Sequence, residues 1–106
     1  MNEPGQSLRL NDWLDSRSPR PPLELRRRLA GIVGDTECKP QDLPTVLIDM
    51  AEKILAGIGD DRSAAADLLA ADSLITYAME AAADSGEDVE LIAADAAARI
   101  AAVKIA

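Results

Sequence analysis

Four side chains that carry oxygen atoms recur at every fourth position in the second half of the chain. Asp72, Thr76, Glu80 and Asp84 lie in the stretch LLAADSLITYAMEAAAD, residues 68–84. Residues four apart lie on the same face of an α-helix, so a helix would align these oxygens. Such oxygens can bind Mg²⁺ or Ca²⁺, and two carboxylates can act as an acid–base pair. Metal binding and acid–base catalysis are therefore two hypotheses for this stretch.

A third hypothesis makes Asp72 a structural anchor. In helical projection Asp72 falls between Leu68 and Met79, which belong to the expected apolar stripe. A buried carboxylate needs a hydrogen-bonding or charged partner, which an N-terminal arginine or the Trp13 indole could supply. Asp72 and Glu80 would lie about 12 Å apart along the helix axis, too far for an acid–base pair. We therefore favour the anchor and predict Asp72, Thr76 and Trp13 as buried polar groups, with no catalytic, cofactor-binding or metal-binding residues and no cofactor.

Part of the same stretch resembles a helix of the trans-prenyl diphosphate synthases, in which a run of the type LAGDALLTLAFE occurs. The similar positions here are Leu69, Ala70, Asp72, Leu74, Thr76, Ala78, Met79 and Glu80. The resemblance covers under a fifth of the chain, and the aspartate-rich DDxxD motifs of that family are absent. It implies an alternative function, namely a small-ligand or metal-binding enzyme subunit or fragment centred on Asp72.

Composition excludes several other functions. The chain has 106 residues, enough for one domain, and a net charge of −8, which argues against binding to nucleic acids or to anionic membranes. It has no histidine, so histidine-based triads and the usual zinc sites are excluded. The common glycine-rich phosphate-binding motifs are also absent. These absences favour a protein that is not an enzyme.

Charge is distributed unevenly along the chain. Residues 1–40 carry seven Lys/Arg and six Asp/Glu, whereas residues 41–106 carry four and thirteen. We expect the basic N-terminal part to pack on the acidic part. The cluster Arg26, Arg27 and Arg28 could bind an acidic partner or phosphate, although a solvated helix face is the simpler interpretation.

Apolar periodicity predicts helices over almost the whole chain and no sheet. The expected helices span about 7–16, 22–34, 43–58, 62–84 and 87–104, after a disordered tail at residues 1–6. Ser85 and Asp88 resemble a capping box at the start of the last helix. The predicted fold is all-α: one domain, residues 7–106, forming a small up-and-down bundle of four helices plus a short N-terminal helix.

The last expected helix carries two apolar stripes. Val89, Ile92, Ala96, Ile100 and Val103 form the first, and Leu91, Ala94, Ala98, Ala102 and Ile105 form the second. A helix in a small bundle needs one such stripe, so the second predicts a neighbour from the same chain or from a second copy. We expect a homodimer, and a function in protein–protein interaction or assembly.

Cysteine content and the N-terminal sequence bear on the compartment. Cys38 is the single cysteine, so an internal disulfide is excluded and a reducing compartment is favoured. Residues 1–13 lack the apolar run of a secretory signal. We therefore expect a cytoplasmic protein.

Overall fold

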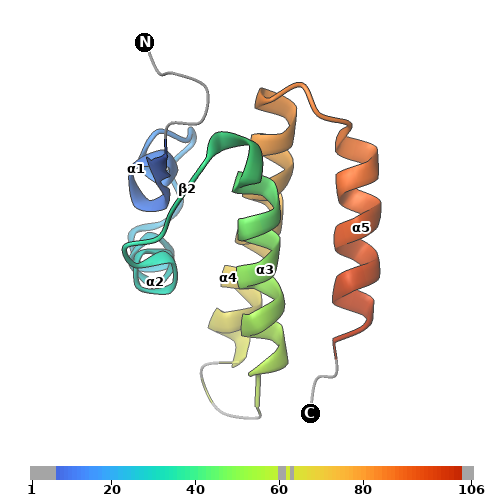
Figure 1. The fold of residues 1–106 in the computed structure, drawn as a ribbon. Helices are drawn as coiled ribbons and strands as arrows, with labels where there is room; N and C mark the ends of the chain where they lie inside the picture. The colour runs from blue at the N-terminus through green and yellow to red at the C-terminus, as the bar shows by residue number, and fades with distance from the viewer. Residues whose placement is uncertain (1–6, 60–61, 63, 104–106) are drawn as a thin grey trace.

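A computed structural model describes residues 7–59, 62 and 64–103 of the chain. The predicted tail at residues 1–6 lies outside these residues. The elements follow in the order β1 (Leu8–Arg9), α1 (Leu10–Asp15), α2 (Leu23–Val33), β2 (Glu37–Cys38), a 3₁₀ turn (Pro40–Asp42), α3 (Leu43–Ala56), α4 (Ala64–Asp84) and α5 (Val89–Ala101). In Figure 1, α3 and α4 run side by side in the centre, with α1 and α2 on one side and α5 on the other.

The prediction of an all-α fold is confirmed, and α3, α4 and α5 alternate in direction (Figure 1). The prediction that there is no sheet is wrong in one detail. Leu8 pairs with Cys38 and Arg9 with Glu37 in a short antiparallel ladder. Two-residue strands are too short to show the alternation of side chains that identifies a strand in a sequence.

The core lies mainly between α3 and α4. On α3 the periodic leucines and isoleucines meet α4, and Leu47, Ile48 and Ala51 are almost completely buried. The facing side of α4 is built largely from small side chains. Its buried residues are Ala70, Ala71, Leu74, Tyr77, Ala78, Ala81 and Ala82. Small side chains let two helices approach closely, so alanine contributes to the packing of this pair as well as to helix propensity.

The N-terminal helices attach to this core through large side chains. Leu10 and Leu14 of α1 and Leu29 and Val33 of α2 are almost completely buried. Full burial of one such side chain contributes roughly 1.5–3 kcal/mol. The N-terminal layer is therefore firmly anchored.

The C-terminal helix α5 attaches differently, after the linker Ser85–Asp88. Of its residues Val89–Ala101, Ala96 alone is buried, while Ile92 and Ile100 are half-buried against the core. The predicted capping box is wrong in its assignment: Asp88, rather than Ser85, is the N-cap, and its carboxylate accepts a hydrogen bond from the Leu91 amide (3.2 Å). Helix α5 therefore has a capped N-terminus but buries little of its surface.

No helix within the described part of the chain combines the length and apolar character needed to cross a membrane.

Candidate functional site

The structure places Asp72 on the surface of α4, so its prediction as a buried anchor is wrong. Asp72 and Thr76 are both exposed, and no charged residue among those described is buried. The Thr76 hydroxyl donates a hydrogen bond to the Asp72 backbone carbonyl (3.0 Å), inside its own helix. Trp13, the third predicted buried polar group, is half-buried against the core.

The difference concerns which side of α4 faces inward. Each residue turns the helix by about 100°, so Asp72 is about 200° from both Ala70 and Leu74, which are fully buried. The prediction treated the large apolar residues as the centre of the buried face. Leu68 is instead 49% exposed, and Met79 is half-buried at the edge. Alanines occupy the true centre.

Asp72 lines an open hollow of about 290 Å³ together with Glu80 and Tyr77. The neighbouring hydroxyls hydrogen-bond to carbonyls of their own helix, as Ser73 does with Leu69 (2.9 Å). Within the described ranges, no group of three or more Asp, Glu, Cys or His side chains could hold a metal ion. The geometry at Asp72 thus adds no support for the enzyme hypothesis centred on it.

The basic N-terminal part does pack on acidic α4, through other carboxylates. Arg17 contacts Asp84 (Nη1–Oδ2, 2.7 Å) and, more distantly, Glu80 (3.7 Å). Its guanidinium also lies 4.5 Å from the centre of the Trp13 ring, and Trp13 meets Tyr77 edge-on at 6.0 Å. This stack joins α1 to the C-terminal half of α4, and sequence reasoning did not find it.

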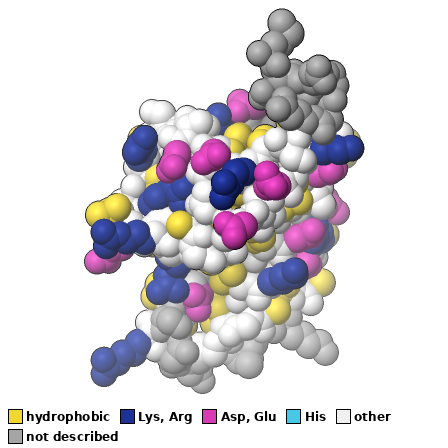
Figure 2. Space-filling view, turned by 60° about the vertical axis from the view of Figure 1, so that its left-hand side comes forward, with side chains coloured by type: hydrophobic (Ala, Val, Ile, Leu, Met, Phe, Trp, Pro, Cys, Tyr) yellow, Lys and Arg dark blue, Asp and Glu magenta, His cyan; other side chains and the backbone are white. Residues whose placement is uncertain are grey.

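The three arginines predicted to bind a partner have different surroundings. Arg26 hydrogen-bonds to Asn11 (3.0 Å) and pairs with Asp15 (3.0 Å), so its charge is engaged inside the N-terminal layer. Arg28 pairs with Asp67 of α4 (2.9 Å). Arg27 is exposed and makes no ion pair with any described residue. Figure 2 shows this side of the molecule covered by interspersed basic and acidic side chains.

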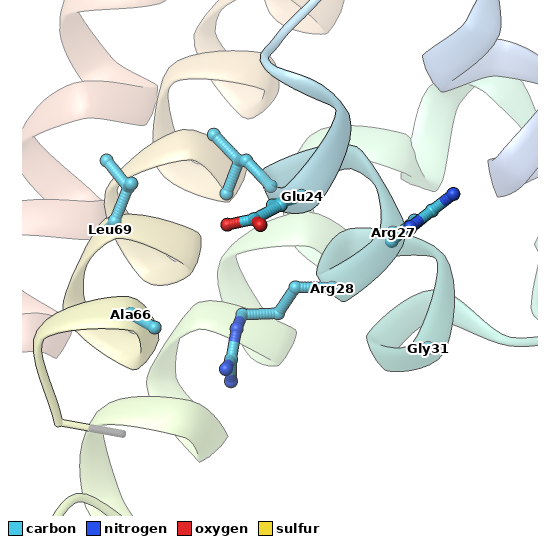
Figure 3. Close-up of a pocket in the computed structure, with 7 residues that line it drawn as sticks. Glu24, Arg27, Arg28, Gly31, Ala66 and Leu69 are labelled. Carbon is cyan, nitrogen blue, oxygen red and sulfur yellow. The ribbon is translucent and has the colours of Figure 1, made fainter. Parts of the chain in front are cut away.

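A hollow of about 610 Å³ lies between α2 and α4. Figure 3 shows Glu24 and Arg28 pointing from α2 toward α4 beside Leu69, whereas Arg27 points away from α4. Leu69 is 52% exposed. The hollow is open to solvent and combines apolar and charged groups, which suits a protein segment better than an enclosed small ligand.

The α4–α5 groove is an apolar hollow of about 250 Å³. Its lining residues are Ile75, Met79, Ala93, Ala96, Ala97 and Ile100. The groove lies along the surface where α5 rests on α4, and it is open to solvent. Ile75, Met79 and Ile100 in its lining are only half-buried, so they contribute less to the attachment of α5 than fully buried side chains would.

The side of α5 turned away from the core is the second apolar stripe predicted from the sequence. Its described members, Leu91, Ala94, Ala98 and Ala102, are all exposed, and we call them the outer face of α5. The fifth predicted member, Ile105, lies outside the described residues. Leu91 is 68% exposed. Within the described part of the chain, no other helix covers this face.

A second arginine that sequence reasoning missed fastens α5 to α3. Arg99 contacts both Asp49 and Glu52 through Nη2, the latter at 2.8 Å. Its hydrogen bonds with Glu52 and then Asp49 raise the pKa of the guanidinium above its ordinary value. Arg99 is the single Lys or Arg between residues 63 and 103, and that isolation in an acidic region was the available signal.

Cys38 lies half-buried in the short strand β2. Burial, with a smaller contribution from the Asp42 carboxylate, raises the pKa of its thiol above the ordinary value. A raised pKa lowers the fraction of reactive thiolate at neutral pH. Among the described residues, the groups that shift this pKa therefore favour the neutral thiol.

Comparison with known proteins gives no family for this chain: no protein-family model matches it, and neither the curated proteins nor the solved structures contain a significant match.

Proposed function

We propose that this protein acts by protein–protein interaction, that its partner is a second copy of itself, and that α5 is the contact element. The exposed apolar side of α5 is the observation that carries the proposal. Six of its eight exposed residues are apolar: Leu91, Ala93, Ala94, Ala97, Ala98 and Ala101. The other two are Glu90 and Asp95.

Helix propensity explains only part of this composition. Alanine is the strongest helix former, so an alanine-rich helix is expected to be helical without extensive contacts. Propensity does not explain why Leu91 is exposed, nor why the outer face lacks charged side chains. A helix that always faces water usually carries charged or polar residues on that side. The composition of α5 therefore supports the proposal that a partner covers it.

A second copy fits this surface for two reasons. Most soluble oligomers are homo-oligomers, with twofold symmetry the commonest, and a twofold axis brings the same surface of both copies together. With a net charge of −8 on each copy, the contact must be made where charge is low. The outer face of α5 meets that condition, since Glu90 and Asp95 lie only at its edges.

The mass of the protein in solution tests the proposal. We expect size-exclusion chromatography with light scattering, at tens of micromolar chain, to give twice the chain mass of 11.2 kDa. Leu91→Glu places a charge on the outer face and should shift the mass toward the monomer. Leu23→Glu is the matched control, because Leu23 of α2 is also exposed (64%) but lies away from α5. A monomer in the unmodified protein would refute self-pairing.

The α2–α4 hollow supports a second candidate, the binding of an acidic protein segment. Arg27 belongs to its lining and is exposed, although its side chain points away from α4, and Leu69 offers an apolar contact. Binding of this kind should weaken as salt concentration rises, because exposed charges are screened. Pairing through the outer face of α5 should instead strengthen with salt, which screens the repulsion between two acidic copies. Titration at several salt concentrations separates the two candidates.

The proposed compartment remains the cytoplasm. The single cysteine and its half-buried thiol fit a reducing environment.

A further inference from the structure

We infer that two copies of this protein pair by exchanging α5, so that α5 of each copy packs on α3 and α4 of the other. This exchange of α5 rests on the self-pairing proposed above. It adds that α5 is the segment exchanged and that it packs on α3 and α4 of the second copy. Four features suggest this exchange of α5: the small outer face, the weak attachment of α5, the two carboxylates that bind Arg99, and the linker before α5.

The outer face of α5 is too small to hold a stable dimer by itself. A helix of 13 residues is about 20 Å long and about 10 Å wide, so one face of it offers a few hundred Å² at most. A stable interface buries roughly 800 Å² on each partner. A dimer that persists must therefore use further surface, and the surface α5 already covers on α3 and α4 provides it.

Releasing α5 from its own core exposes fewer fully buried side chains than releasing α1 and α2 would. Ala96 is its one buried residue, Ile92 and Ile100 are half-buried against the core, and Ile100 also lines the α4–α5 groove. In an exchanged dimer the same contacts re-form with the second copy, so little contact energy is lost. The N-terminal helices bury four large side chains and could not separate so readily.

The surface of α3 and α4 that lies under α5 matches the chemistry of an α5 from a second copy. Asp49 and Glu52 lie three residues apart on α3 and converge on Arg99. The surface under α5 also includes the apolar side chains of Ile75 and Met79, which line the α4–α5 groove. A helix with one arginine and an alanine–isoleucine stripe satisfies both parts, and α5 of another copy is such a helix.

The linker Ser85–Asp88 limits the geometry of the exchange. Four residues span at most about 13 Å, so an exchanged α5 begins close to the end of its own α4. Leu91 lies three residues beyond this linker. In an exchanged dimer, the exposed Leu91 side chain is therefore the part of the outer face closest to its own α4. There it can become buried between the two copies.

The turn that returns α5 to its own core depends on one glycine. Gly86 has φ 73°, in the left-handed region, and the Glu87 amide closes the end of α4 by donating to the Ala82 carbonyl (2.9 Å). Glycine adopts this conformation without strain, whereas alanine does not. Alanine at position 86 would favour a linker that continues away from the core.

Exchange is tested by reversing the charges on the two sides of the Arg99 contact in separate proteins. The first variant is Arg99→Glu, and the second is Asp49→Arg with Glu52→Arg. Each variant alone places like charges together and should lose its dimer. In a mixture, each α5 meets a complementary core in the other variant, so both contacts of an exchanged heterodimer are restored. Native mass spectrometry should then show the heterodimer as the main species.

The outcomes separate exchange from the simpler self-pairing. A mixture without heterodimer, while the unmodified protein is dimeric, would overturn exchange and leave pairing through the outer face in place. A monomeric unmodified protein would overturn both. The variant that combines all three substitutions is the control for folding, because it restores complementary charges and should behave like the unmodified protein.

Gly86→Ala gives an independent test that leaves the α5 contacts unchanged. We expect the dimer dissociation constant to fall at least about tenfold, because alanine disfavours the closed turn and favours a continuing helix. Gly86→Asn is the matched control and should change it less, since asparagine tolerates the left-handed region. An unchanged or weaker dimer in Gly86→Ala would contradict exchange.

Discussion

The N-terminal helices α1 and α2 and the C-terminal helix α5 flank the same α3–α4 pair but are held to it by different means. The N-terminal layer inserts Leu10, Leu14, Leu29 and Val33, each almost completely buried. Helix α5 buries one alanine. Both layers add an arginine that contacts two carboxylates, and the N-terminal layer adds the pair Arg28–Asp67 as well, but the larger difference lies in the apolar contacts.

This difference shows that helix formation and helix attachment come from separate properties of a sequence. Alanine gives α5 a high intrinsic preference for helix, which requires no neighbour. Attachment requires apolar area removed from water, and alanine has little to offer. A sequence can therefore specify a helix firmly and its position weakly, which leaves the helix available to a partner.

The largest change in the free energy of unfolding is expected from a substitution in the buried face of α2. Leu29→Ala should lower the free energy of unfolding by about 2–5 kcal/mol, because it removes a fully buried leucine and leaves a cavity. Ile100→Ala is the matched substitution in α5 and should lower it by less, since Ile100 is half-buried. Urea denaturation followed by circular dichroism measures both. Equal losses would mean that α5 is anchored as firmly as α2.

The two arginines provide the next comparison. Arg17→Met removes two ion pairs and the contact with Trp13. It should lower the free energy of unfolding by only about 1 kcal/mol, because the carboxylates are partly exposed. It should also change the fluorescence of Trp13. Arg99→Met should instead speed hydrogen exchange of α5 amides and leave α1 and α2 unaffected. Hydrogen exchange that becomes faster by the same factor in all helices would contradict the separate attachment of α5.

Tyr77 offers a pH test of the N-terminal attachment. Burial, followed by the nearby Glu80 carboxylate, raises the pKa of Tyr77 above its ordinary value of 10.0. The folded state therefore retains the proton to a higher pH than the unfolded state, so this contribution is complete below pH 10 and is lost as pH rises through the folded pKa. Alkaline unfolding should be less steep in Tyr77→Phe. An identical pH profile in both proteins would contradict the burial of this hydroxyl.

The smallest effect is expected at Asp72. Asp72→Asn should change the free energy of unfolding by less than about 0.5 kcal/mol, as is usual for an exposed site without an ion pair among the described residues. Thermal denaturation near neutral pH measures it. A loss of several kcal/mol would restore the buried-anchor hypothesis.

The sequence predicted the helices well and the faces of α4 poorly. Proline, glycine and the apolar period mark helix ends and existence, and α2 (Leu23–Val33) falls inside its predicted range of 22–34. The buried face of α4 was missed because alanine is compatible with both a buried and an exposed position. Its role depends on how closely α3 approaches, which local sequence does not encode.

Interactions between distant residues were the least predictable part of the candidate site. The uneven charge along the chain predicted that the basic N-terminal part packs on the acidic part, yet the carboxylates involved on α4 are Asp67, Glu80 and Asp84 rather than Asp72. Choosing among these carboxylates requires the relative rotation of the helices. The second stripe of α5 was visible in the sequence, because period and composition alone define it.

Hydrogen exchange of α5 at different protein concentrations tests most directly whether this helix is the contact with a second copy. Protection of the α5 amides, measured at low and at high micromolar chain, should increase with concentration, while protection of α2 stays constant. That pattern requires a partner that covers or receives α5. Protection of α5 that is the same at every concentration, together with a monomeric mass, would contradict the account.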